Sequence, residues 1–191
     1  MFFRVFFLAF IFTLTSCATT DPEPESKNTI ESPDVNFIIG NVTSIYNIKL
    51  SVGNVDFENE TFKEDWFSSL SYEYTKDKRY IVGTAKAGSY IGITSTKAQD
   101  ASGTPLGTFT PCNKTLVFRL PYGGADVYVT DVNYKWNNVS ISPIYSDQIE
   151  QAKKAFNTNN IIQARYLQLN ADLYNDCETQ NPNPVIMTRP I

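Results

Sequence analysis

The chain has 191 residues, no histidine, 14% aromatic residues and a formal net charge of -4 at pH 7. Without histidine, Ser-His-Asp and Cys-His catalysis are excluded, and the commonest metal ligand is missing. The sequence therefore predicts a protein that is not an enzyme and that has no metal site and no cofactor. The mild negative charge argues against a nucleic-acid partner.

The chain begins with a short apolar segment. Arg4 precedes an apolar run over residues 5–14, which is shorter than the about 20 residues that cross a bilayer. A basic start followed by such a run is typical of a secretory signal peptide.

The end of this run, Leu14-Thr15-Ser16-Cys17, resembles the lipobox of bacterial lipoproteins. The resemblance implies cleavage of residues 1–16 and acylation of Cys17, and therefore a membrane partner reached through lipid. Because Ala18 follows in place of an aspartate, the resemblance also implies location at the outer membrane. It does not indicate which face of that membrane carries the protein. The alternative is a plain signal peptide followed by a chance cysteine.

The two ends of the remaining chain are poor in large apolar side chains. Residues 18–34 are mostly Thr, Ser, Asp, Glu, Pro and Asn, and residues 178–191 are rich in Pro, Asn and Gln. Such compositions do not bury enough surface to offset the ordering entropy. We expect a lipidated cysteine and tether over 17–34, a folded domain over 35–177 and a flexible tail over 178–191.

Two further cysteines, Cys112 and Cys177, remain after cleavage. An exported compartment permits disulfides, so a single bridge between them is the simplest prediction. Two free buried thiols are the alternative. A zinc site is less favoured, because two cysteines without histidine make a poor ligand set.

The central region shows the period-two alternation of half-buried strands. Alternation is clearest over residues 46–52, 116–120 and 139–142. Further strands are predicted at Val35–Ile39, Ser71–Thr75, Arg79–Thr84, Ser89–Thr94 and Ala125–Val132. Turn signals separate them. The spacing predicts a mainly β fold, an antiparallel β-sandwich of about seven or eight strands.

One C-terminal amphipathic helix is predicted to follow the strands. Asp147 can cap it, with Glu150 three residues later as in a capping box, and Glu150 and Lys154 form an i, i+4 pair. Ile149, Ala152 and Phe156 share its apolar face. Residues 161–173 fit both helical and strand spacing, and a second helix is the weakly favoured interpretation.

The order of these features resembles uncharacterised bacterial lipoproteins of the DUF2846-like kind. The resemblance covers about residues 80–156. It rests on Ala87-Gly88-Ser89-Tyr90, the strand over 116–120, a glycine turn, Val127-Tyr128-Val129-Thr130-Asp131-Val132, the strand over 139–141 and Asp147 opening the helix. It implies a small β-sandwich with a terminal helix and an envelope location, and no particular activity.

Carboxylate pairs are the remaining route to catalysis, as in glycoside cleavage, where two carboxyl groups lie about 5 to 10 Å apart. The candidates are Asp126 with Asp131, and Asp56, Glu58 and Glu60. The alternative is an ordinary acidic surface, since the chain has 20 acidic residues. We favour that alternative, with Asp131 ending a strand.

The aromatic residues are candidates for binding. Trp66, Tyr128, Tyr134 and Trp136, with Phe67, Tyr72 and Tyr74, could line a groove for a glycan or a peptide, because rings supply a large contact area. Core packing is the alternative for most of them.

The sequence as a whole predicts a lipid-anchored envelope protein that acts as an accessory or interaction module. A carbohydrate-binding or carbohydrate-cleaving surface lipoprotein and a structural spacer of the envelope are the alternatives.

Overall fold

The structure is a computed structural model that describes residues 33–111, 114–136 and 141–171. Most of these residues lie in strands, so the prediction of a mainly β protein is confirmed. Cys17, Cys112 and Cys177, the predicted lipidation and disulfide sites, lie outside the described residues. None of the described segments forms a helix with the length and hydrophobicity needed to span a bilayer.

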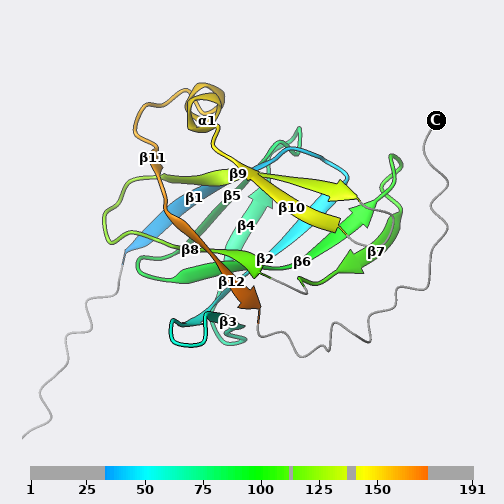
Figure 1. Cartoon of the computed structure of the whole chain (residues 1–191). Coiled ribbons are helices and arrows are strands. Elements are labelled where there is room, and N and C mark those ends of the chain that lie inside the picture. The colour runs from blue at the N-terminus through cyan, green and yellow to red at the C-terminus, as the bar shows by residue number, and fades with distance from the viewer. Residues whose placement is uncertain (1–32, 112–113, 137–140, 172–191) are drawn as a thin grey trace, which may run out of the picture. The chain divides into compact units, whose positions relative to one another are not determined.

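One sheet contains the first strand of the domain (Figure 1). In spatial order its strands are β10 (Ile141–Ser146), β9 (Val127–Trp136), β1 (Asp34–Asn41), β5 (Tyr80–Lys86) and β4 (Ser71–Tyr74), and β11 (Ile162–Gln163) also pairs with β9. β1 and β11 run parallel to β9, while the other pairs are antiparallel. The purely antiparallel arrangement predicted from the sequence is therefore wrong for β9.

The second sheet closes on itself. Its order is β2 (Tyr46–Asp56), β3 (Thr61–Glu64), β12 (Tyr166–Ala171), β8 (Lys114–Arg119), β6 (Tyr90–Gln99) and β7 (Pro105–Phe109), and β2 also pairs with β6. The pairing of β2 with β6 makes a five-stranded barrel of β2, β3, β12, β8 and β6, with β7 attached at its side. Closure removes the free sheet edges that an open sandwich would leave.

The main core lies between the two sheets. Phe37, Ile39 and Ile81 come from the first sheet, and they meet Leu50, Ile93, Leu116 and Phe118 from the second. Each of these side chains is at most 3% exposed. The alternating positions predicted over residues 46–52 and 116–120 are thus confirmed as core.

The barrel has a smaller core of its own. Phe62 lies inside it with Val117 and Leu169. Gly53 and Gly92 face the Phe62 ring, and a Cβ on Gly92 would lie 2.6 Å from that ring. A side chain at these positions would therefore displace the phenylalanine that fills the barrel.

Two tyrosines of β4 connect the sheets through hydrogen bonds. The backbone N–H of Ile48 donates to the Tyr74 hydroxyl at 2.5 Å, and the Tyr74 hydroxyl donates to the Ile48 carbonyl at 3.2 Å. The N–H of Leu50 donates to the Tyr72 hydroxyl at 3.3 Å. These hydroxyls satisfy backbone groups that are buried where β2 faces the other sheet.

The predicted helix forms as α1 (Ile149–Ala155). The Asp147 carboxylate accepts a hydrogen bond from the N–H of Ile149, but Glu150 pairs with Lys153 at 2.8 Å and not with Lys154. Ala152 on the apolar face is fully buried. It packs with Tyr128 and other residues of the first sheet.

The second predicted helix, over residues 161–173, is wrong, because the described part of this segment forms β11 and β12. Ile162 pairs with Val127, and Tyr166 pairs with Phe118. The strand spacing of the segment prevails because its backbone completes both sheets. The sandwich of seven or eight strands is not confirmed either, since twelve strands form in the described residues and one sheet is closed.

The loops gather at two ends of the strands. We call the end at which the described chain begins the entry end. Pro33 lies there beside turn 87–89, and the connections 57–60, 65–70 and 120–126 are at the same end, at the left and lower left of Figure 1. At the far end are the turns 42–45, 75–79 and 100–104. Strand pairing fixes this grouping, because the start of β1 pairs with the end of β5 and the start of β4 pairs with β5 near the same end.

Candidate functional site

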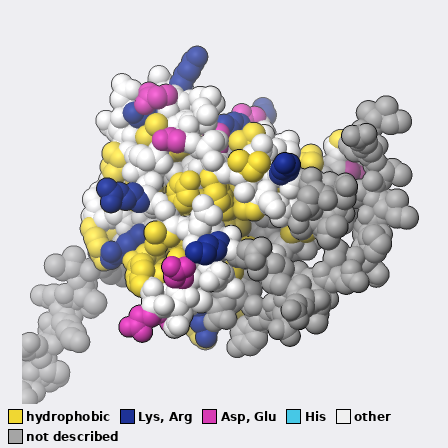
Figure 2. Space-filling view, in the orientation of Figure 1, with side chains coloured by type: hydrophobic (Ala, Val, Ile, Leu, Met, Phe, Trp, Pro, Cys, Tyr) yellow, Lys and Arg dark blue, Asp and Glu magenta, His cyan; other side chains and the backbone are white. Residues whose placement is uncertain are grey.

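The most exposed aromatic side chains of the described residues all lie at the entry end. Phe57 is 62% exposed, Trp66 76%, Phe67 99% and Tyr122 66%. They come from three connections that are far apart in the sequence. Figure 2 shows hydrophobic side chains with basic and acidic ones around the lower left, where the described chain begins. An exposed gathering of rings is characteristic of an interaction surface.

Arg119 organises part of this end. Its guanidinium lies 5.4 Å from the Tyr90 ring centroid and 5.1 Å from that of Tyr122. Its Nη2 donates to the Tyr122 hydroxyl at 2.8 Å, and its Nε donates to the Gly88 carbonyl at 3.3 Å. The Phe57 ring lies 6.0 Å from Tyr90. We call Phe57, Tyr90, Arg119 and Tyr122 the Arg119 cluster.

Turn geometry contributes to the position of Tyr122. Gly88 has a φ of +83°, and a Cβ at this residue would lie 2.7 Å from the Tyr122 hydroxyl. Glycine is therefore required both for the left-handed backbone and for the space beside the ring. An exposed tyrosine that is fixed from two sides is a preorganised contact group.

The other exposed rings lie on a turn built around Asp65. Its Oδ1 accepts from the Phe67 N–H at 3.0 Å, and its Oδ2 accepts from the Ser68 hydroxyl at 2.5 Å. These two hydrogen bonds, the one from Ser68 first, lower the pKa of Asp65 below its ordinary value of 3.8. The Lys49 ammonium lies 5.7 Å from the Trp66 ring centroid.

Asp131, predicted to end a strand, lies within β9 and is buried. Its carboxylate forms an ion pair with Arg79 and accepts a hydrogen bond from the Tyr128 hydroxyl at 2.7 Å. Its position inside a strand corrects the prediction. A Cβ at Gly40 would collide with this carboxylate, so glycine makes room for it.

The Tyr128 hydroxyl also accepts from the N–H of Gln148, next to α1, at 3.1 Å. Burial, then the hydrogen bond to Asp131, raise the pKa of Tyr128 well above its ordinary value of 10.0. The Arg79, Asp131 and Tyr128 side chains therefore fasten the helix to the first sheet.

Among the remaining candidate carboxylates, those of Asp56, Glu60 and Asp126 have separate structural partners. Asp126 accepts from the Asn36 amide at 2.9 Å, and Glu60 pairs with Lys114 at 2.9 Å. Asp56 accepts from the backbone N–H groups of Glu58 and Asn59 and closes the turn between β2 and β3. These contacts explain the carboxylates without a catalytic pair.

The predicted binding aromatics separate into two groups. Trp66 is exposed, as a binding residue requires. Tyr128 is fully buried, so its assignment to a binding patch is wrong. Tyr134 is partly buried and packs on Tyr46 at 4.8 Å, with its hydroxyl 2.7 Å from that of Thr96. The Trp136 side chain lies outside the described part.

Phe57, Arg119 and Tyr122 were not predicted from the sequence as contact residues. Phe57 and Tyr122 are large apolar residues inside turn signals, Asp56 to Asn59 and Pro121 to Gly124. An aromatic residue at such a position has no strand face to bury it, and this signal could have indicated exposure.

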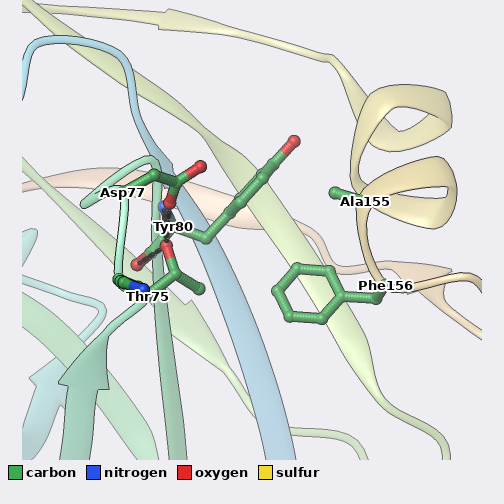
Figure 3. Close-up of a pocket in the computed structure, with 6 residues that line it drawn as sticks. Thr75, Asp77, Tyr80, Ala155 and Phe156 are labelled. Carbon is green, nitrogen blue, oxygen red and sulfur yellow. Dashed lines mark hydrogen bonds between the residues drawn. The ribbon is translucent and has the colours of Figure 1, made fainter.

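The far side of the domain carries a shallow pocket of about 610 Å³. Figure 3 shows the Tyr80 side chain extending toward the helix with the Phe156 ring beside it, and Thr75, Asp77 and Ala155 around them. The two rings are 5.3 Å apart, so they pack on each other. Asp77 already accepts from the Thr75 hydroxyl at 2.6 Å and from the Arg79 N–H.

In the described ranges no group of three His, Cys, Asp or Glu residues is arranged to hold a metal ion. Comparisons of the chain with models of protein families, with curated proteins and with solved structures found no match.

Proposed function

We propose that this protein is a lipid-anchored, non-enzymatic interaction module of the bacterial cell envelope, attached to the outer membrane through Cys17. The gathering of Phe57, Trp66, Phe67 and Tyr122 at one end is the observation that carries the interaction function. Large exposed rings are unfavourable in water unless a partner covers them. The entry end is therefore the proposed contact surface.

Two local contacts at this end support this proposal. Asp65 closes the backbone turn that carries Trp66 and Phe67, and Arg119 holds the Tyr122 side chain. A ring that is already held, as that of Tyr122 is, loses less conformational entropy on binding, and aromatic and arginine residues are enriched among the residues that dominate binding energies at interfaces.

A non-enzymatic role is supported by the state of the candidate carboxylates. A general acid or base needs a free carboxyl group near a reacting atom. Asp131 is neutralised by Arg79, and Asp126 and Glu60 have structural partners. We also propose that the two packed sheets are a closed variant of the small sandwich expected of DUF2846-like lipoproteins.

The anchor is tested by metabolic labelling with a palmitate analogue. We expect label in the wild-type chain and none in Cys17→Ala, which should also lose its firm association with membranes. A Cys17→Ala variant that still partitions with membranes in detergent extraction would contradict the anchor.

The predicted disulfide is tested by mass spectrometry of peptides from the unreduced protein. We expect one linked peptide pair that contains Cys112 and Cys177. Alkylation of both thiols without prior reduction would refute the bridge.

The interaction function is tested by crosslinking the lipidated protein in its native envelope and identifying what is recovered. We expect the recovery of whatever molecule contacts the entry end, protein or phospholipid, to fall in Phe57→Ser/Tyr122→Ser. The matched control is Val42→Ser/Ile45→Ser, which removes exposed apolar groups from the far end. Equal recovery with both variants would contradict the entry end as the contact surface and would favour a structural spacer.

A carbohydrate-binding function is the second candidate, because Trp66 is exposed beside the polar side chains of Lys49 and Glu64, which pair at 3.1 Å. Sugar rings stack on such a face. Titration with soluble peptidoglycan fragments tests it, with Trp66→Ser as the binding variant. Unchanged Trp66 fluorescence at millimolar fragment would exclude it.

A further inference from the structure

We propose that the entry end lies on the phospholipid bilayer, so that the exposed rings contact the membrane interface and the far end points away from it. The inference rests on the proposed anchor at Cys17 and names the partner of the proposed contact surface.

The path of the chain is the first support. The Pro33 carbonyl accepts from the Ala87 N–H at 2.8 Å, so the described chain starts beside turn 87–89. In the same turn, the Gly88 carbonyl accepts from Arg119. The segment that comes from Cys17 therefore reaches the domain next to the Arg119 cluster, and not at the far end.

The chemistry of the surface is the second support. Tryptophan and tyrosine are enriched at membrane interfaces, where the ring is in an apolar layer and its polar atom stays hydrated. Trp66, Phe67, Tyr122 and Phe57 provide such rings. Arg119 lies between Tyr90 and Tyr122, and long basic side chains place an apolar stem and a charged head across an interface.

Charge does not favour this placement, because only three of the described acidic side chains at this end have a basic partner. Asp34 pairs with Lys86 at 3.1 Å, Glu64 with Lys49 at 3.1 Å and Glu60 with Lys114 at 2.9 Å. Asp56, Asp65 and Asp126 accept hydrogen bonds from uncharged groups. Contact with the bilayer therefore depends on the rings.

Because the connecting sequence is short, a weak contact is enough to hold the entry end against the bilayer. About sixteen residues separate Cys17 from Pro33, and a chain of that length reaches at most about 55 Å. A domain held within that distance meets the surface at an effective concentration in the millimolar range. Contact by the four exposed rings is then enough to keep the entry end oriented toward the bilayer.

The experiment uses the chain from Ala18 to Ile191 with an N-terminal hexahistidine tag in place of the lipid. The chain itself has no histidine, so nickel-chelating lipid in phosphatidylethanolamine/phosphatidylglycerol vesicles attaches it only through the tag. Trp136→Phe leaves Trp66 as the single tryptophan. Acyl chains brominated near the headgroup quench tryptophan that reaches the interface.

We expect brominated lipid to reduce Trp66 emission at least twofold. In the matched control, Trp66→Phe/Trp136→Phe/Ile45→Trp, the single tryptophan lies at the far end, and its emission should change by less than a tenth. Circular dichroism confirms that both variants are folded.

Equal quenching of the two tryptophans, or none at Trp66, would overturn the proposal. So would protection of Trp66 from acrylamide by soluble peptidoglycan fragments but not by vesicles, which would assign the surface to a glycan. Because the tag supplies the attachment, these results do not depend on lipidation of Cys17, which the labelling experiment decides separately.

Discussion

The two ends of the strands are built from different residues. Turns at the far end are short; Asp77 and Asp100 close two of them with hydrogen bonds to backbone N–H groups, and the third carries the partly exposed aliphatic residues Val42 and Ile45. Connections at the entry end carry the four rings that are more than half exposed. The far end also adjoins the buried pair of Arg79 and Asp131.

From this difference we expect the far end to contribute to the stability of the fold and the entry end to contribute to contact with a partner. Hydrogen bonds and burial at the far end satisfy groups of the chain itself, so changes there should lower the free energy of unfolding. Rings at the entry end are mostly in water, and removing an exposed side chain changes stability little. Substitutions at the two ends should therefore differ in their effect on the free energy of unfolding.

The largest loss is expected from Asp131→Ala. It leaves Arg79 without its carboxylate and Tyr128 without its acceptor, and breaking a buried pair in this way costs about 3 kcal/mol. Urea unfolding followed by circular dichroism measures it. Asp126→Ala, at an exposed carboxylate of the entry end, is the control and should cost less than about 0.5 kcal/mol. Equal losses would contradict the division.

Tyr74→Phe should lower the free energy of unfolding by about 1.5 kcal/mol, since it leaves the buried N–H of Ile48 without its acceptor. Burial raises the pKa of Tyr74 from 10.0 to about 12. The neutral hydroxyl therefore stabilises the fold fully below pH 10 and loses that contribution as the pH rises toward 12. Urea unfolding at pH 8 and at pH 11 measures both effects. A loss for Tyr72→Phe, with its longer bond, that exceeds the loss for Tyr74→Phe would contradict the assignment.

Much of this fold was predictable, because alternation over residues 46–52 and 116–120 specifies one buried face regardless of the partner strand. The closure of the second sheet was not. It depends on β12 pairing with both β3 and β8, across more than a hundred residues of sequence in the first case. Residues 161–173 have both spacings, and only these pairings decide between them.

The candidate site was predicted only in part, for a related reason. Trp66 lies outside any alternating segment, and it is exposed as expected. Tyr128 lies on the strand face that α1 covers, and a period of two cannot show that both faces of a strand are buried. The Arg119 cluster joins four segments, so its members do not form a motif in the sequence.

Gly88→Ala should cost about 1 kcal/mol, because its φ of +83° is unfavourable for alanine. The added methyl group would also displace the Tyr122 ring. Urea unfolding measures the cost, and solvent exposure of Tyr122 by hydroxyl-radical labelling measures the displacement. Gly103→Ala is the control, because Gly103 has a similar φ of +87° but open space around it. Equal Tyr122 labelling in the two variants would contradict the role given to Gly88.

Acid should loosen the Trp66 turn. The lowered pKa of Asp65 means that the ionised carboxylate stabilises the turn above pH 3.8 and loses this effect as the pH falls through the lower value. Trp66 fluorescence in a Trp136→Phe background should therefore change below pH 3.8. Asp65→Asn lacks the titrating group and should lack this transition. The same transition in both chains would assign it to another group.

The smallest effect on stability is expected from Trp66→Ser/Phe67→Ser, although it removes the two most exposed rings of the described residues. Both side chains are largely in water, so little apolar burial is lost, and the free energy of unfolding from urea titration should stay within about 0.5 kcal/mol of wild type. The same variant should lose most of the vesicle contact, which can be measured by quenching of a reporter tryptophan placed at Phe57 in a Trp136→Phe background. A large loss of stability would mean that these rings pack on the domain, and the entry end would then be part of the fold and not a surface for a partner.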